Sequence, residues 1–227
     1  HQLKGQRMRW HEALLIAVGE VNKDRSPYAS KHAIRDVRAR RQANLEFLKS
    51  CDLENRETGE RIDLISKVMG SISNPEIRRM ELMNTIAGIE RYAAAEGDVG
   101  MFITLTAPSK YHPTRQVRKG ESKTVQLNHG WNDEAFNPKD AQRYLCHIWS
   151  LMRTAFKDND LQVYGLRVVE PHHDGTPHWH MMLFCNPRQR NQIIEIMRRY
   201  ALKEDGDERG AARNRFQAKH LNRGGAA

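Results

Sequence analysis

The stretch VVEPHHDGTPHWHMMLF, residues 168–184, decides the fold of this chain. Its centre holds Asp174-Gly175, a strong signal for a tight turn, and apolar or β-branched residues lie on both sides of that pair. We therefore expect a β-hairpin, with one strand over residues 162–170 and the other over residues 178–185.

The second strand of this hairpin carries an alternating pattern. Successive residues of a strand point to opposite faces, so His178 and His180 share one face and Trp179 points to the other. Met181 and Leu183 join Trp179 on a face that we expect core helices to cover. Two imidazoles on one face can share a single metal ion. The alternative interpretation is a pair of exposed histidines without a metal.

Glu170 is the expected third ligand, because a hard divalent cation prefers an anionic group beside two neutral imidazoles. The turn length decides which face its carboxylate takes. A two-residue loop would pair Glu170 with Trp179, on the wrong face. A three-residue loop that ends at a left-handed Gly175 pairs Glu170 with His178, on the metal face. The sequence thus predicts that Glu170, His178 and His180 are metal ligands and catalytic residues.

The other histidines have weaker patterns. His172 and His173 lie in the turn, where we expect polar loop residues or contacts to a phosphate, with metal ligation as the alternative. Asp174 is interpreted as turn chemistry. Four further histidines belong to no constellation in the sequence: His112, His129, His147 and His220.

Outward from the hairpin, the first hundred residues have a helical pattern throughout. Apolar residues recur at helical spacing over residues 9–21, 29–50 and 75–93. We expect a helical N-terminal region over residues 1–97 and a second domain over residues 98–227.

Asn-Pro pairs mark helix starts, because Asn accepts a hydrogen bond from a free backbone N–H and Pro has no N–H to satisfy. Such pairs predict three helix starts: Asn74-Pro75, Asn137-Pro138 and Asn186-Pro187.

The region after residue 97 mixes strands and helices. Residues 101–106 form a short apolar run typical of a buried strand, and residues 216–221 predict another short strand. Helices are predicted over residues 138–157 and 187–203. This order predicts an α+β fold with a largely antiparallel sheet.

The charge balance indicates a polyanionic partner. Lysine and arginine total 37 against 28 acidic residues, a net charge of +9, and neutralising phosphates releases condensed counterions. A membrane surface is the weaker expectation, because the basic residues are scattered and no apolar run of about eighteen residues exists. Three widely spaced cysteines indicate reduced thiols in a cytoplasmic protein.

Residues 108–131 have no clear period and are interpreted as a long polar loop. Basic and aromatic residues alternate there, which suits single-stranded DNA, where phosphates pair with cations and bases stack on rings. A solvated insertion is the alternative. The predicted DNA-binding residues are Lys110, Tyr111, Arg115, Arg118, Lys119 and Lys123.

Two motifs carry a resemblance to a known family. The segment HWH, residues 178–180, matches the His-hydrophobic-His signature of HUH endonucleases, and MFITLTAPSKYHP, residues 101–113, resembles their first motif. Together with residues 74–100 they resemble the gene A replication-initiation endonucleases of temperate tailed phages and their prophages. The likeness extends from about residue 73 to the end of the sequence and, more weakly, through the N-terminal helices.

The resemblance implies a five-stranded antiparallel HUH palm and a rolling-circle endonuclease that uses Mg²⁺ or Mn²⁺. A tyrosine would attack single-stranded DNA at a replication origin and stay joined to the 5′ phosphate, in the cytoplasm of a bacterial host. Host replication proteins would be further partners. The family's nucleophiles are paired tyrosines three residues apart on a helix, and no such pair occurs among the six tyrosines here. We expect the nucleophile beyond residue 227.

Other classes of protein fit less well. Cupin-type oxygenases carry a carboxylate shortly after HxH, but MMLFC follows His180 here. Histidine-triad hydrolases need a third alternating histidine, and Met182 occupies that position. A non-catalytic metal- and DNA-binding module with the same fold stays open as the alternative function.

Overall fold

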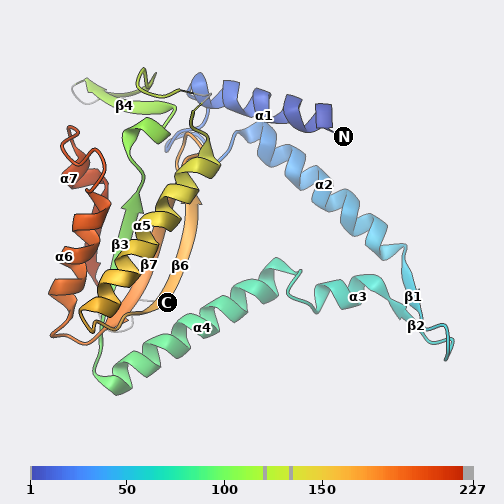
Figure 1. Cartoon of the computed structure of the whole chain (residues 1–227). Helices are drawn as coiled ribbons and strands as arrows, with labels where there is room; N and C mark the ends of the chain where they lie inside the picture. The colour runs from blue at the N-terminus through green and yellow to red at the C-terminus, as the bar shows by residue number, and fades with distance from the viewer. Residues whose placement is uncertain (1, 120–121, 133–134, 222–227) are drawn as a thin grey trace. The chain divides into compact units, whose positions relative to one another are not determined.

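The computed structural model describes residues 2–119, 122–132 and 135–221 (Figure 1). The chain divides into two compact units. The first is built from the residues up to Ser30 and from Ile89 onward, and the second is Lys31–Gly88.

The first unit is organised around a four-stranded sheet. Its strands are β3 (Val99–Thr106), β6 (Tyr164–Pro171), β7 (Pro177–Cys185) and β8 (Phe216–His220), in the order β6-β7-β3-β8. Every neighbouring pair is antiparallel. The predicted α+β class and antiparallel sheet are confirmed. Within the described residues this sheet has four strands, so a fifth strand stays a prediction.

Two helices cover one face of the sheet, α5 (Pro138–Asp158) and α6 (Arg190–Ala201) (Figure 1). Trp179 is fully buried on this face with Met181 and Leu183, as the alternation predicted. Its indole N–H donates to the side-chain oxygen of Gln142 on α5 at 3.0 Å, so the polar atom of this large ring keeps a partner.

Two of the three Asn-Pro signals begin helices where expected. Asn137 forms a capping box with Asp140 at the start of α5, and Asn74 accepts from the backbone N–H of Glu76 at the start of α4 (Pro75–Glu96). The third prediction was wrong. Asn186 accepts instead from the backbone N–H of Arg188 at 3.0 Å, which closes a turn, and α6 begins at Arg190.

The sequence pattern predicted helices throughout the first hundred residues, but the second unit also contains strands. Between α2 (Lys31–Lys49) and α3 (Leu64–Met69) lies a short antiparallel hairpin, β1 (Asp52–Glu54) and β2 (Arg61–Asp63). The backbone N–H of Asn55 donates to the Glu60 carbonyl at 2.8 Å and closes the loop. Strands this short carry too few residues for a period to be visible. The last helix, α4, runs from this unit into the first.

The segment predicted as a long loop is also a hairpin. After the short helix η1 (Ser109–Tyr111), β4 (Thr114–Lys119) pairs with β5 (Ser122–Leu127). Its sequence is mostly polar, so the apolar alternation that marks a half-buried strand is absent. The first unit also contains α1 (Gln2–Ala17) and the four-residue α7 (Ala211–Asn214). None of the described helices is both long and apolar enough to span a membrane.

Candidate metal centre

The hairpin of β6 and β7 has the predicted register. Glu170 lies opposite His178. The backbone N–H of His172 donates to the Thr176 carbonyl at 2.8 Å, which leaves a three-residue loop. Gly175 ends that loop at φ +82°, a conformation that residues with a Cβ rarely adopt. The turn chemistry therefore places Glu170 on the face of the histidines.

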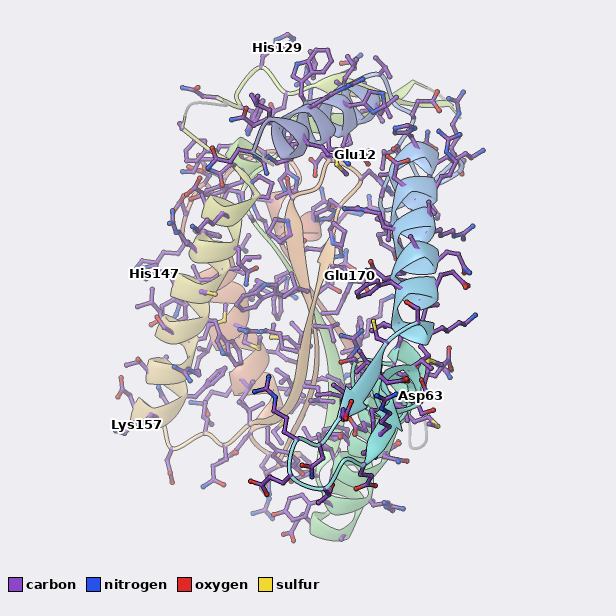
Figure 2. The ribbon with its side chains drawn as sticks, turned by 90° about the vertical axis from the view of Figure 1, so that its right-hand side faces the viewer. Glu12, Asp63, His129, His147, Lys157 and Glu170 are labelled. Carbon is purple, nitrogen blue, oxygen red and sulfur yellow. The ribbon has the colours of Figure 1, made fainter. Side chains whose placement is uncertain are left out.

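Glu170, His178 and His180 converge on one point. The Nε2 atoms of the two histidines are 2.9 Å apart, and Nε2 of His180 is 3.6 Å from the Glu170 carboxylate. One ligand atom from each residue lies within 4.8 Å of the other two. Figure 2 shows Glu170 on its strand, with His147 projecting from the outer side of α5. Adjacent ligands of an octahedral cation, each about 2.1 Å from it, are roughly 3 Å apart, so the spacing suits a divalent cation.

Neighbouring side chains orient the two imidazoles. Nδ1 of His180 lies 3.1 Å from the hydroxyl of Thr104 on β3, and Phe102 stacks on the ring at 5.2 Å. His172 stacks on His178 with a centroid distance of 4.0 Å. A hydrogen bond to Nδ1 leaves Nε2 free to point into the site. The ring of His180 is therefore held ready to ligate through Nε2.

Burial favours the neutral form of two of these rings, His172 and His178. Burial, followed by the proximity of His180, lowers the pKa of His178. Burial next to His178 lowers the pKa of His172 to about 3. Only a neutral imidazole has a free lone pair for a metal, so the lowered pKa of His178 fits a ligand role.

The structure adds a polar pair that the sequence pattern did not reveal. Nδ1 of His112 lies 3.0 Å from the carboxylate of Asp174 in the turn, and the His112 ring contacts His172 at 5.1 Å. Burial alone would raise the pKa of Asp174, but hydrogen bonds from His112 and Thr176 outweigh it and lower the pKa. His112 had no visible partner in the sequence because 62 residues separate the pair.

A cleft of about 490 Å³ adjoins the cluster. Its lining includes His178 of β7 and residues of β3, β8 and α7. Further lining residues are Thr104, Thr106, Arg209, Asn214 and Gln217.

Two of the six predicted DNA-binding residues, Lys110 and Tyr111, make contacts within the protein. The Lys110 ammonium pairs with two carboxylates, at 2.6 and 3.1 Å, which raise its pKa. The Tyr111 ring packs between Phe136 and Tyr144. Arg115 is exposed on β4. The side chains of the remaining three lie outside the described residues, although their backbones belong to β4 and β5: Arg118, Lys119 and Lys123. A DNA-binding role for the six stays a prediction.

Three of the other histidines lie outside the cluster: His129, His147 and His220. His129 follows β5, His147 is exposed on α5 and His220 ends β8. Among the described residues, only Glu170, His178 and His180 form a group that could hold a metal ion.

The fold and this cluster define a class: an α+β protein whose antiparallel sheet presents two imidazoles and a carboxylate at the spacing of a cation site. The whole chain, residues 1–227, matches the family described as bacteriophage replication gene A protein. It therefore belongs to that family, as its motifs predicted.

Similar curated proteins agree with this assignment. The chain is 99% identical, over its full length, to the replication gene A protein of Escherichia phage P2, and covers 30% of that protein. It is 46% identical over 86% of its length to the replication gene A protein of Escherichia phage 186, covering 27% of it. A probable replication endonuclease from a prophage-like region of Salmonella paratyphi A is 38% identical over 90% of the chain, which covers 24% of that relative. The chain thus spans about a third or less of these relatives. No solved structure matches it.

Proposed function

We propose that this chain contains the metal- and DNA-binding part of an HUH-type endonuclease, which nicks single-stranded DNA at a phage origin and starts rolling-circle replication. The observation that carries the proposal is the convergence of Glu170, His178 and His180 on one face of the sheet. The names of the relatives, replication gene A protein and probable replication endonuclease, support the same role.

The donor set fits Mg²⁺ or Mn²⁺. Two neutral nitrogens and one anionic oxygen leave coordination positions open for water or a phosphate oxygen. When bound, such a cation polarises a phosphodiester and stabilises the negative charge that develops during cleavage. Glu170 and His178 reach the site from opposite strands of one hairpin, and Thr104 orients His180. These residues would align the scissile phosphate without supplying the nucleophile.

We place the nucleophilic tyrosine outside residues 1–227. Among the described residues, no tyrosine lines the cleft beside the cluster. Tyr144 is buried in the hydrophobic core, and Tyr164 donates to the Asp98 carboxylate at 2.8 Å. Neither is available to attack a phosphodiester.

Other parts of the prediction belong to the same proposal. The exposed Arg115 and the other basic residues of the β4–β5 hairpin would contact DNA phosphates. The four-stranded sheet would be the centre of a five-stranded HUH palm. Host replication proteins as partners and the host cytoplasm as location are proposed on the family resemblance.

Titration of the 227-residue chain with Mn²⁺ tests the metal site. Isothermal titration calorimetry should show one site, and His180→Ala should weaken it at least about tenfold, the loss typical of a metal ligand or its supporting shell. His147→Ala is the matched control, since His147 is exposed on α5, and should bind Mn²⁺ like the unchanged protein. Equal affinity in all three proteins would refute the site.

A second experiment tests cleavage. The full-length phage P2 relative is incubated with Mn²⁺ and end-labelled single-stranded origin DNA, and the same protein carrying the His180→Ala change is run beside it. We expect nicking and a covalent protein–DNA adduct only in the first. Binding of metal and DNA without cleavage by either protein would instead favour the non-catalytic module. An adduct formed by the 227-residue chain alone would refute the placement of the tyrosine.

A further inference from the structure

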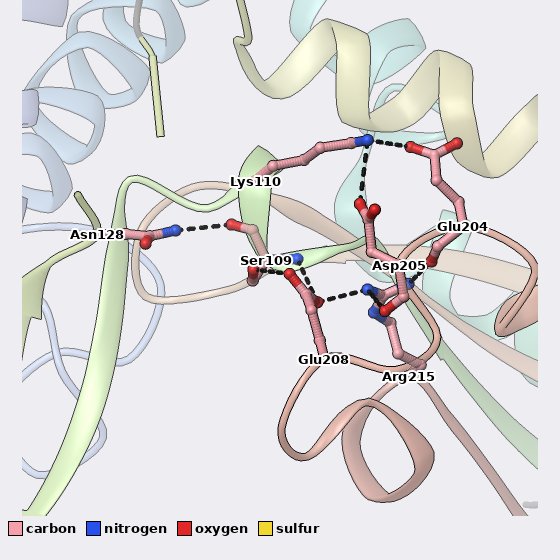
Figure 3. Close-up of polar contacts among 7 residues, drawn as sticks. All are labelled: Ser109, Lys110, Asn128, Glu204, Asp205, Glu208 and Arg215. Carbon is pink, nitrogen blue, oxygen red and sulfur yellow. Dashed lines mark hydrogen bonds and ion pairs between the residues drawn. The ribbon is translucent and has the colours of Figure 1, made fainter. Parts of the chain in front are cut away.

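An acidic loop, residues 202–210, is fastened to the connection between β3 and β4 (Figure 3). The Ser109 hydroxyl and its backbone N–H both donate to the Glu208 carboxylate. The next residue, Lys110, pairs with two further carboxylates of the loop at 2.6 and 3.1 Å. Two consecutive residues after β3 thus hold the loop as one wall of the cleft.

Arg215 completes this network from inside the protein. Its side chain is 3% exposed, and its guanidinium donates to the backbone carbonyls of Glu204 at 2.7 Å and Asp205 at 2.9 Å. It also donates to the Glu208 carboxylate at 2.5 Å. The negative charges of Glu204, Asp205 and Glu208 are therefore partly compensated within the protein by Arg215 and Lys110. This pairing reduces the repulsion that the acidic loop would otherwise exert on DNA.

Arg209 lies in the same loop but is not part of this network. It is exposed and lines the cleft, and within the described part of the chain it makes no ion pair. Arg213 is equally exposed, four residues later, but does not line the cleft. Of the two arginines that line the cleft among the described residues, Arg215 is ion-paired and Arg209 is not.

Two amide side chains share the cleft with Arg209. Asn214 ends α7, and Gln217 lies on β8 directly opposite Thr104 of β3. Directly opposite residues in an antiparallel pair point to the same face, so Gln217 is on the face of His180, whose strand partner is also Thr104. Two strand spacings, roughly 10 Å, separate β7 from β8. The cleft thus runs across the sheet from His178 to the amide side chains of Asn214 and Gln217.

We propose that this cleft is a subsite for one nucleotide next to the scissile phosphate. Arg209 binds its phosphate, and Asn214 and Gln217 hydrogen-bond the edge of its base. Arginine suits phosphate oxygens geometrically, and an amide offers the paired donor and acceptor that a base edge presents. The volume falls within the range of small-ligand sites. The inference rests on the proposed function, because it assumes single-stranded DNA as the ligand.

Binding of labelled oligo(dT), oligo(dA) and oligo(dC) of one length tests the subsite. Fluorescence anisotropy with the 227-residue chain and Mn²⁺ is measured over a range of salt concentrations. Arg209→Ala should weaken all three complexes by about the same factor, near tenfold for a charged hydrogen bond. It should also reduce the slope of log affinity against log salt by about 0.7. Arg213→Ala, the matched control, should change neither quantity.

The amide variants should behave differently. Asn214→Ala and Gln217→Ala should change the ratio of affinities among the three oligonucleotides and leave the salt slope unchanged, because base contacts carry sequence information and release no counterions. All variants are first checked for an unchanged thermal midpoint.

Two results would overturn the subsite while leaving the proposed function standing. One is equal weakening by Arg209→Ala and Arg213→Ala. The other is DNA binding whose base preference survives both amide substitutions. Failure of the unchanged chain to bind any oligonucleotide, although it binds Mn²⁺, would instead count against both proposals.

Discussion

Replacing the buried Arg215 with methionine should destabilise the first unit strongly. Methionine keeps much of the apolar stem but removes the charge and all the donors. Three hydrogen bonds are lost, two to backbone carbonyls and one to the Glu208 carboxylate. Removing one partner of a buried ion pair costs about 3–5 kcal/mol. Because the Glu208 side chain is 32% exposed, water recovers part of this loss, and we expect about 3 kcal/mol.

Urea denaturation followed by circular dichroism at pH 7 measures this loss as a change in the free energy of unfolding. Arg143→Met is the matched control, because Arg143 pairs with Asp140 on α5 while 66% exposed. Such a surface pair contributes at most about 1 kcal/mol. A loss below about 1 kcal/mol for Arg215→Met, or equal losses for both variants, would refute the reasoning.

We expect the loss of stability in Arg215→Met to depend on pH. Burial alone would raise the pKa of Glu208, but hydrogen bonds from Ser109 and Arg215 outweigh it and lower the pKa. A carboxyl group with a lowered pKa stabilises the folded state above its unfolded pKa, about 4.3, and this contribution disappears as the pH falls through the folded value. The difference in stability between the unchanged protein and Arg215→Met should therefore narrow in acid. A difference that widens below about pH 4 would contradict this account.

Three further predictions concern the sheet. Mn²⁺ at 100 times its dissociation constant should raise the free energy of unfolding by about 2.7 kcal/mol, and His180→Ala should abolish this gain; a gain of the same size in the variant would locate the ion elsewhere. Gly165→Ala should cost about 3 kcal/mol or more in urea denaturation, because its Cβ would lie 1.9 Å from the Met182 carbonyl oxygen. Gly88→Ala is the control, because a Cβ added at this helical position would have no neighbouring atom within 4 Å. It should instead stabilise the protein by about 0.5–1 kcal/mol. Equal effects of the two changes would show that the strands around Gly165 relax freely. Trp179→Ala should cost about 3–5 kcal/mol, and a loss near zero would mean that Trp179 is not the centre of the core.

The sequence predicted correctly the features that depend on residues close together in the chain, such as a turn length and two helix caps. The length of the turn around Gly175 sets the pairing of Glu170 with His178, because a slip of one residue would turn the carboxylate to the opposite face. The capping signals at Asn74 and Asn137 acted over one helical turn. The hairpins at residues 52–63 and 114–127 escaped prediction, since short or polar strands show no apolar alternation.

The tertiary structure alone determined which residues surround the three candidate ligands, Glu170, His178 and His180. The order of strands brings β8, with Gln217, beside β3 and so beside the histidines. It also brings His112 to Asp174 and Arg215 to the acidic loop. Strand order and the packing of loops follow from the burial of the whole core, and the period of one segment carries no record of its distant partner. The local sequence thus determined the three candidate ligands, whereas the fold determined the cleft and the charges around them.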